Sequence, residues 1–284
     1  MQELESPDRL RGLVERHLAR NGLAIPKLPE VAVRVVESGT TKAGNAQVLA
    51  DIIHSDAILT EYVLHIVASA AKRPALPIAS LQHAIAWLGI DEVANIAFTL
   101  ALQAKILHVE GQQRRARRLW RHSLASALWS RQVARRLGGE TGVCYLCGLL
   151  HNIGKAVTLG TVHDVAQLAE QGLDRDDYDR LIELFHRDVG RRVISAWALP
   201  PPVPMVIAHW EDYASAGAVL WESNVVNVAH KLADFTLHEP EMMKRDVFMM
   251  DKGFRDLGLS AQDAVQLFDA TAEIIAEMDR YLSP

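Results

Sequence analysis

This chain of 284 residues lacks features that define several large classes of protein. It has only two cysteines, which excludes a small secreted scaffold held together by disulfides. No run of about 18 apolar residues occurs, so the sequence predicts no membrane-spanning helix. The first residues show no basic stretch followed by an apolar core, so no signal peptide is expected. Together these absences predict a globular cytoplasmic protein.

An excess of positive charge is also missing. The chain has 30 lysines and arginines against 35 acidic residues, a formal net charge of −5. This balance argues against a protein that wraps nucleic acid, and we expect no DNA binding. One local basic cluster stands out, consisting of Arg114, Arg115, Arg117, Arg118 and Arg121. It indicates either a solvated helix face or a docking surface for an acidic partner or for nucleotide phosphates.

Strict alternation of apolar and polar residues, which is typical of strands, does not extend beyond a few residues anywhere. Apolar residues instead recur in steps of three and four, as over 181–197, which predicts amphipathic helices. The same spacing predicts helices over 49–68, 119–137 and 225–237. The predicted fold class is therefore all-α.

Glycine and proline are sparse, and they mark the expected helix ends. Pro26 and Pro29 precede a helix expected over 30–38, with Gly39 as its C-terminal cap. Ser80 is a predicted N-cap, because a serine oxygen accepts hydrogen bonds from the first free backbone N–H groups.

A polar and basic stretch near Gly111 marks a predicted boundary within the chain. We expect an N-terminal helical subdomain over 1–112 and a helical bundle over 113–284. The last part of that bundle, 251–282, is predicted to form two amphipathic helices that cover it, Ile275 being among the buried residues.

Twelve histidines are more than a chain of this length usually holds. Five of them fall on apolar faces of successive predicted helices, where they could converge in the core. These are His122, His151, His186, His209 and His230. Buried imidazoles need partners, and a metal ion or a phosphate satisfies several at once. The alternative is a set of histidines bonded to one another, to carbonyls and to trapped water.

Several motifs, taken in order, resemble those of the HDOD domains, the HD-related output domains of bacterial signalling proteins. In the wider HD superfamily of helical metal-dependent phosphohydrolases the pattern is His, then His-Asp, then Asp. His122 and the run His151-Asn152-Ile153-Gly154-Lys155 resemble the first two parts of it. The resemblance covers about 20–235, and further segments carry it: 25–31, 49–59, 77–89, 186–190, 197–200 and 207–209.

The resemblance implies an HD-domain-like bundle of many helices, with a pocket for one or two divalent metals. It implies that Lys155 contacts a phosphate; because no carboxylate stands beside this lysine, a surface role is the alternative. The residues that it places in the pocket are His122, His151, Asn152, His186, His209 and His230, with Asp234 as the alternative to His230 for the last position.

The chain departs from the superfamily pattern at Asn152 and at Trp210, and also at the closing position if His230 rather than Asp234 stands there. Asn152 replaces the tandem aspartate, and His230 or Asp234 stands at the closing one. Trp210 replaces the second imidazole of a His-His pair found in related phosphodiesterases. The loss of carboxylates removes negative charge that would hold a hard cation and balance a metal-bound hydroxide. The site is therefore predicted to be degenerate, that is, to lack the full ligand set of an active hydrolase.

We therefore expect a signal-transduction output module that binds protein partners or a ligand rather than catalysing a reaction. The alternative is a metal-dependent phosphohydrolase acting on a nucleotide or a cyclic dinucleotide. The expected cofactor is a transition metal, namely zinc, iron or nickel, or none. The expected partners are signalling proteins and a nucleotide or another phosphate-containing ligand. The oligomeric state stays open.

Overall fold

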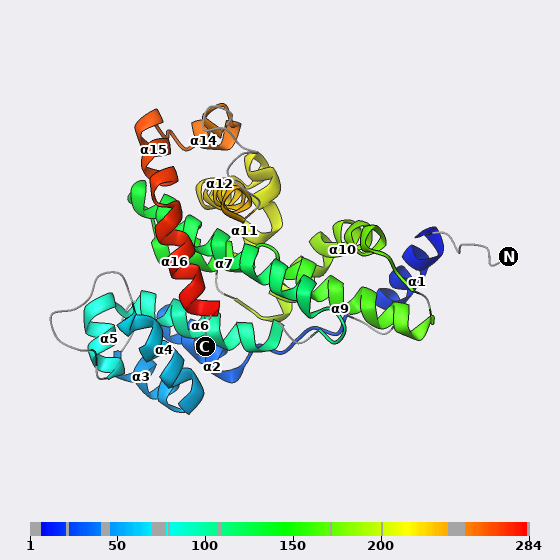
Figure 1. Cartoon of the computed structure of the whole chain (residues 1–284), viewed down its shortest axis with the longest axis horizontal. Helices are drawn as coiled ribbons and strands as arrows, with labels where there is room; N and C mark the ends of the chain where they lie inside the picture. Colours follow the sequence, from blue (N-terminus) through cyan, green and yellow to red (C-terminus); the bar gives the residue numbers. More distant parts are fainter. Residues whose placement is uncertain are drawn as a thin grey trace.

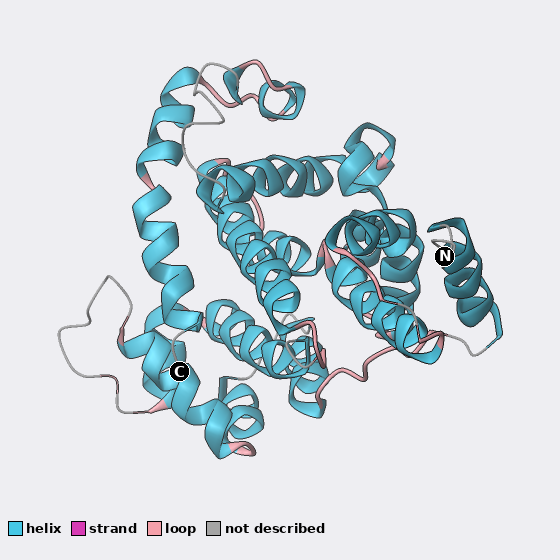
Figure 2. Cartoon of the chain, turned by 45° about the vertical axis from the view of Figure 1, so that its right-hand side comes forward, coloured by secondary structure: helices cyan, strands magenta, loops and turns pink. Residues whose placement is uncertain are grey.

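The computed structural model describes residues 7–20, 23–40, 46–69, 78, 80–106, 109–170, 172–199, 201–237 and 248–282. Throughout these ranges the chain forms helices joined by short connections and contains no strand (Figures 1 and 2). The predicted all-α class is confirmed. Within the same ranges, no helix is both long and apolar enough to cross a membrane.

Helices α2 to α5 pack around α6 in the first part of the chain. Asp56 divides the helix predicted over 49–68, because its side chain accepts a hydrogen bond from Leu59 N and starts a new helix. Ser80 caps α5 as predicted, whereas Gly39 lies within α2 rather than beyond its end. The bounds are α1 (Pro7–Arg20), α2 (Glu30–Thr40), α3 (Ala46–His54), α4 (Ala57–Ala68), α5 (Leu81–Leu88) and α6 (Ile90–Ile106).

The long helix α7 (Gln113–Arg136) forms the centre of the second part (Figure 1). It packs against α8 and α12 and also contacts α9, α15 and α16. Its residues from 122 to 131 are buried on every side, which explains the alanines and serines among them. The other bounds are α8 (Thr141–Leu150), α9 (Ile153–Leu168), α10 (Arg175–Ala196), α11 (Val203–His209), α12 (Leu220–Leu237), α14 (Lys252–Asp256), α15 (Ala261–Asp269) and α16 (Thr271–Leu282).

The C-terminal segment differs from its prediction. Three helices, α14 to α16, replace the two expected over 251–282, because Asp251 and Ser260 each cap a new helix. Ile274 and Met278 are buried on α16, whereas Ile275 is 37% exposed rather than buried. The apolar stripe of α16 is therefore narrower than the sequence suggested.

Helix α16 connects the two parts of the chain, as the red helix in Figure 1 shows. The buried Arg131 of α7 forms ion pairs with Glu92 of α6 and with Glu277 of α16. Near the end of α16, Arg280 donates a hydrogen bond to Ser69 O, at the C-terminal end of α4. One buried cation thus joins three helices that lie far apart in the sequence.

Candidate metal centre

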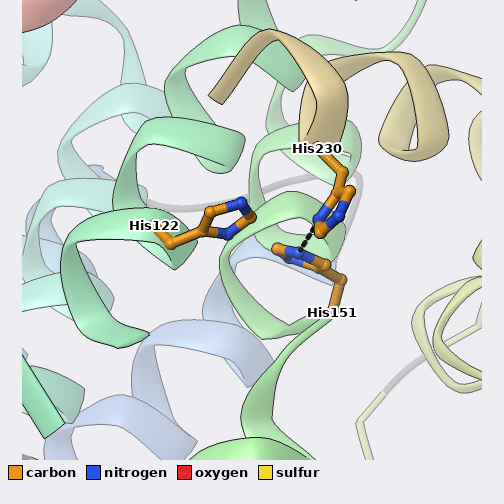
Figure 3. Close-up of side chains that lie close together, drawn as sticks. All are labelled: His122, His151 and His230. Atoms are coloured by element: carbon orange, nitrogen blue, oxygen red, sulfur yellow. Dashed lines mark hydrogen bonds between the residues drawn. The ribbon is translucent and has the colours of Figure 1, made fainter. Parts of the chain in front are cut away.

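Three helical segments bring three of the five histidines together. His122 lies on α7, His151 directly follows α8, and His230 lies on α12. One ring nitrogen from each lies within 4.8 Å of the other two, and Figure 3 shows the three side chains meeting. We call these three residues the histidine centre. Two of its members are buried, since His122 is 8% exposed and His151 is 3% exposed, whereas the side chain of His230 is 23% exposed.

The corner between α8 and α9 positions two residues of the site. A Cβ on Gly148 would lie 2.4 Å from Ser130 Oγ, so the glycine lets α8 approach α7 closely. The chain then turns at His151 and Asn152, and both side chains are buried. The close packing of α8 on α7 therefore directs these two polar side chains into the core.

Hydrogen bonding determines which nitrogen of His151 is available. Its Nδ1 donates to Gly148 O at 2.6 Å, because a carbonyl oxygen can only accept. The neutral ring therefore has its lone pair on Nε2. That atom lies 3.1 Å from His230 Nδ1, the contact drawn as a dashed line in Figure 3. A metal ion or a proton can satisfy this facing pair of nitrogens.

Asp234 holds the other two rings. Its Oδ1 accepts a hydrogen bond from His122 Nε2 at 3.0 Å, and its Oδ2 lies 3.5 Å from His230 Nε2. The sequence left open whether His230 or Asp234 occupies the last position of the site. In the structure a ring nitrogen of His230 belongs to the centre, and Asp234 contacts two of its imidazoles from outside. A carboxylate behind an imidazole is the usual support of a metal-binding histidine.

Asn152 contacts the histidine centre through its amide nitrogen. Its Nδ2 donates to His122 Nδ1 at 3.2 Å, consistent with His122 donating through Nε2. Asn152 Oδ1 is buried and has no hydrogen-bond partner among the described residues. An unpaired buried oxygen is costly, and this one lies where the superfamily pattern has a carboxylate.

The donor set fits a transition metal. Three imidazole nitrogens suit zinc, iron or nickel, whereas magnesium and calcium prefer oxygen ligands. The carboxylate of Asp234 supports two of the rings, and Gly148 O supports the third. These residues could therefore hold one metal ion of that class if Asn152 Nδ2 gives up its hydrogen bond to His122 Nδ1.

Trp210 covers the centre on another side. Its ring centroid lies 4.8 Å from those of both His151 and His230, and its ring meets His151 edge to face. Asn227 Nδ2 donates to the backbone oxygen of Trp210 at 3.2 Å and helps to fix its position. Trp210 is itself buried, being only 6% exposed.

Burial keeps two imidazoles of the centre neutral. The loss of hydration lowers the pKa of His151 well below its ordinary value, and neighbouring His230 and His122 lower it further. Burial also lowers the pKa of His230 to about 4, against the opposing effect of Asp234. Neutral imidazoles have the lone pairs that metal binding requires.

We expect the metal-free protein to lose stability in mild acid. Below about pH 6.5 the unfolded chain protonates His151 and His230, whereas folded His230 stays neutral down to about pH 4. The unfolded state then binds more protons, so the free energy of unfolding falls between these pH values. The expected slope is up to about 1.4 kcal/mol per pH unit for each histidine.

Urea unfolding in the presence of a chelator, at several pH values in this window, measures the effect. His230→Gln should flatten the dependence, whereas His209→Gln should leave it unchanged, because His209 lies outside the centre. Equal stability of the native protein at all these pH values would contradict buried neutral imidazoles.

His186 lies beside the centre rather than in it. It is 5% exposed, and its Nε2 is 3.3 Å from Glu183 Oε2 and 3.9 Å from Glu211 Oε1. With His151 and Trp210 it lines a cavity of about 90 Å³. The sequence analysis did not single out the two glutamates. The spacing of Glu183 and His186, three apart on one helix, is the signal that could have found the first.

The structure places the remaining predicted pocket residues differently. His209 is partly exposed and pairs with Ser215 Oγ at 3.2 Å, outside the histidine centre. Lys155 Nζ lies 2.5 Å from Glu183 Oε1, so its charge is already paired. It is close enough to the centre to contribute to the lowered pKa of His151. A phosphate contact by Lys155 would compete with Glu183.

The five arginines of the basic cluster lie in the first three turns of α7, immediately before His122. Arg115 is largely buried against α10, where it forms an ion pair with Asp179 at 2.6 Å. Arg114, Arg117, Arg118 and Arg121 are exposed.

Comparisons with known proteins identify relatives of the whole fold. The family model of the HDOD domain matches residues 25–213. A solved HDOD domain protein of unknown function from Geobacter sulfurreducens aligns with a TM-score of 0.74 at 22% identity, over 97% of this chain and 99% of that one.

A solved protein from Shewanella amazonensis, provisionally named a metal-dependent phosphohydrolase, aligns with a TM-score of 0.70 at 22% identity. The alignment covers 96% of this chain and 99% of that one. At such identities the likeness shows the fold alone. An uncharacterized protein of Treponema pallidum is 22% identical over 187 residues. They make up 63% of this chain but only 36% of the length of that relative.

Proposed function

Since the HDOD family model matches most of its length, the chain belongs to the HDOD domain family, and we propose that it is a signal-transduction output module whose histidine centre is not hydrolytic. In this proposal the module acts by binding a partner protein or a ligand. A transition metal, when bound, links α7, the α8–α9 corner and α12 through His122, His151 and His230. The metal then stabilises the fold instead of activating a substrate.

The small space beside the histidine centre carries this proposal. Trp210 covers two of its imidazoles, and the adjoining cavity has a volume of about 90 Å³. Pockets for ligands of nucleotide size usually have volumes of roughly 300–1,000 Å³. A hydrolytic metal site also needs an open coordination position for water. The cavity beside the imidazoles lies well below that range of volumes.

The side chains around the centre support the same conclusion. Asn152 stands where a carboxylate could accept a proton from water, and a neutral amide cannot take that role. Asp234 already accepts a hydrogen bond from His122 and faces His230, so its oxygens serve the rings. The centre can therefore bind and position, while neither Asn152 nor Asp234 is an unengaged base.

Hydrolysis assays test the proposal. The tag-free protein is mixed with bis(4-nitrophenyl) phosphate or a cyclic dinucleotide, with manganese, iron or nickel added. We expect no turnover above that of His151→Ala. Turnover that both His122→Ala and His151→Ala abolish would overturn the proposal and establish the phosphohydrolase alternative. A gain of activity in Asn152→Asp would support a natural site disabled at that position.

A further inference from the structure

Four exposed arginines form one stripe at the start of α7. Arg114, Arg117, Arg118 and Arg121, which we call the arginine stripe, follow one another at intervals of three, one and three residues. On an α-helix this spacing places them within an arc of about 100°, over about 10 Å of helix length. They therefore present four guanidinium groups on one face.

The stripe has almost no acidic partner. Among the described residues, only Arg118 forms an ion pair, at 3.8 Å from Asp179, and Arg115 already holds that carboxylate at 2.6 Å. Arg114, Arg117 and Arg121 form none within the same ranges. The chain as a whole is acidic, with a net charge of −5. Such a local excess of positive charge is not needed to balance the protein's own acids.

The stripe also lies at the wrong end of its helix for stability. The amino end of a helix carries partial positive charge and free N–H groups, so acidic residues stabilise it. The first turn of α7 contains no acid, and Gln112 gives no side-chain cap. Neighbouring α10 has the ordinary arrangement, in which Asp174 and Asp177 form a capping box. The arginines in the first turns of α7 are therefore expected to lower the stability of this helix.

The stripe lies next to the histidine centre along α7. Arg118 precedes His122 by one helical turn, and Arg121 is its immediate neighbour. His122 in turn donates a hydrogen bond to Asp234, whose side chain is 44% exposed. A molecule bound on the stripe would therefore lie within about one turn of a residue of the centre.

We propose that the arginine stripe docks an acidic segment of a partner protein; the proposal rests on the proposed function, in which this module acts through a partner. Arginine forks bind carboxylates with two parallel hydrogen bonds, and the free N–H groups of the α7 amino end add to the attraction. The short length of the stripe favours such a segment over nucleic acid. Arg115 donates to Arg175 O at 3.3 Å, which places the exposed Asp174 and Asp176 of α10 beside the stripe. These aspartates would repel any anionic chain, whether a phosphate backbone or a longer acidic peptide, that continued past the stripe, so the bound segment is expected to be short.

A peptide-binding experiment tests this proposal. The full chain is titrated against fluorescein-labelled hexaglutamate at low ionic strength, and anisotropy reports binding. The triple variant Arg114→Gln, Arg117→Gln and Arg121→Gln should bind about tenfold more weakly, because exposed ion pairs each contribute modestly. The native protein's affinity should fall as salt is added.

A matched control removes the same charge elsewhere. Arg20→Gln, Arg34→Gln and Arg255→Gln change three exposed arginines that form no ion pair with the described residues. This variant should retain the native affinity to within about twofold, because only distant charges change. Urea unfolding should show that the stripe variant is at least as stable as the native protein.

Three results would overturn the proposal. They are equal weakening by both triple variants, absence of hexaglutamate binding to the native protein, and tighter binding of a twelve-nucleotide single strand than of the peptide. The hydrolysis assay of the histidine centre is independent of all three. A failure of the docking surface is therefore distinguishable from a failure of the proposed function.

Discussion

Gly154→Ala is expected to lower the free energy of unfolding by more than about 3 kcal/mol, because the added methyl group meets main-chain atoms. A Cβ at this position would lie 1.9 Å from His186 O and 2.8 Å from Gly190 N. These atoms belong to the backbone of α10 and cannot rotate away as a side chain can. Helices α9 and α10 would have to separate, and urea unfolding at neutral pH measures the loss.

Gly160→Ala is the matched control on the same helix. A Cβ there meets nothing within 4 Å, and its backbone does not require glycine. Since alanine favours a helix more than glycine does, this variant should gain up to about 1 kcal/mol. Equal free energies of unfolding for the two variants would contradict the close packing of α9 on α10 at Gly154.

Loss of one imidazole is expected to abolish tight metal binding. The tag-free native protein should bind about one equivalent of zinc, measured by competition with a chromophoric chelator. His151→Ala removes the buried Nε2 that faces His230 Nδ1, so affinity should fall by at least about a hundredfold. Asp234→Asn keeps all three imidazoles but weakens their support, and should cost about tenfold to a hundredfold.

His209→Ala is the control for metal binding, because His209 is partly exposed and pairs with Ser215 outside the centre. It should bind zinc as the native protein does. Binding of less than about a tenth of an equivalent by the native protein would leave the histidines as hydrogen-bonded core residues. An equal loss in His209→Ala and His151→Ala would contradict the ligand assignment.

Helical periodicity was enough to predict the fold class and the buried faces on which three of the candidate histidines lie. The steps of three and four placed His122, His151 and His230 on buried faces, and the structure brings these three together. Periodicity tells which face of a helix is buried but not which neighbour covers it. For that reason the sequence grouped His186 and His209 with the other three, although His186 lies beside the centre and His209 outside it.

The last position of the site shows a different limit. His230 and Asp234 are four residues apart, so both lie on one face of α12 and no sequence pattern separates them. Their roles depend on the distance to α7, which the sequence does not contain. The division of the chain at residue 112 also stays a prediction. The break between α3 and α4 could have been predicted, although the sequence analysis expected one helix there, because aspartate is a strong N-cap residue and Asp56 lies at the break.

The contact of Trp210 with two rings of the histidine centre has a practical consequence. An indole next to a charged imidazole or a metal ion changes its fluorescence, because its excited state responds to nearby charge. The fluorescence of Trp210 should therefore report protonation of these imidazoles and binding of a metal ion to them. The chain has six tryptophans, and the difference between the native spectrum and that of Trp210→Phe isolates this signal. Occupancy of the site can then be followed in solution without any label.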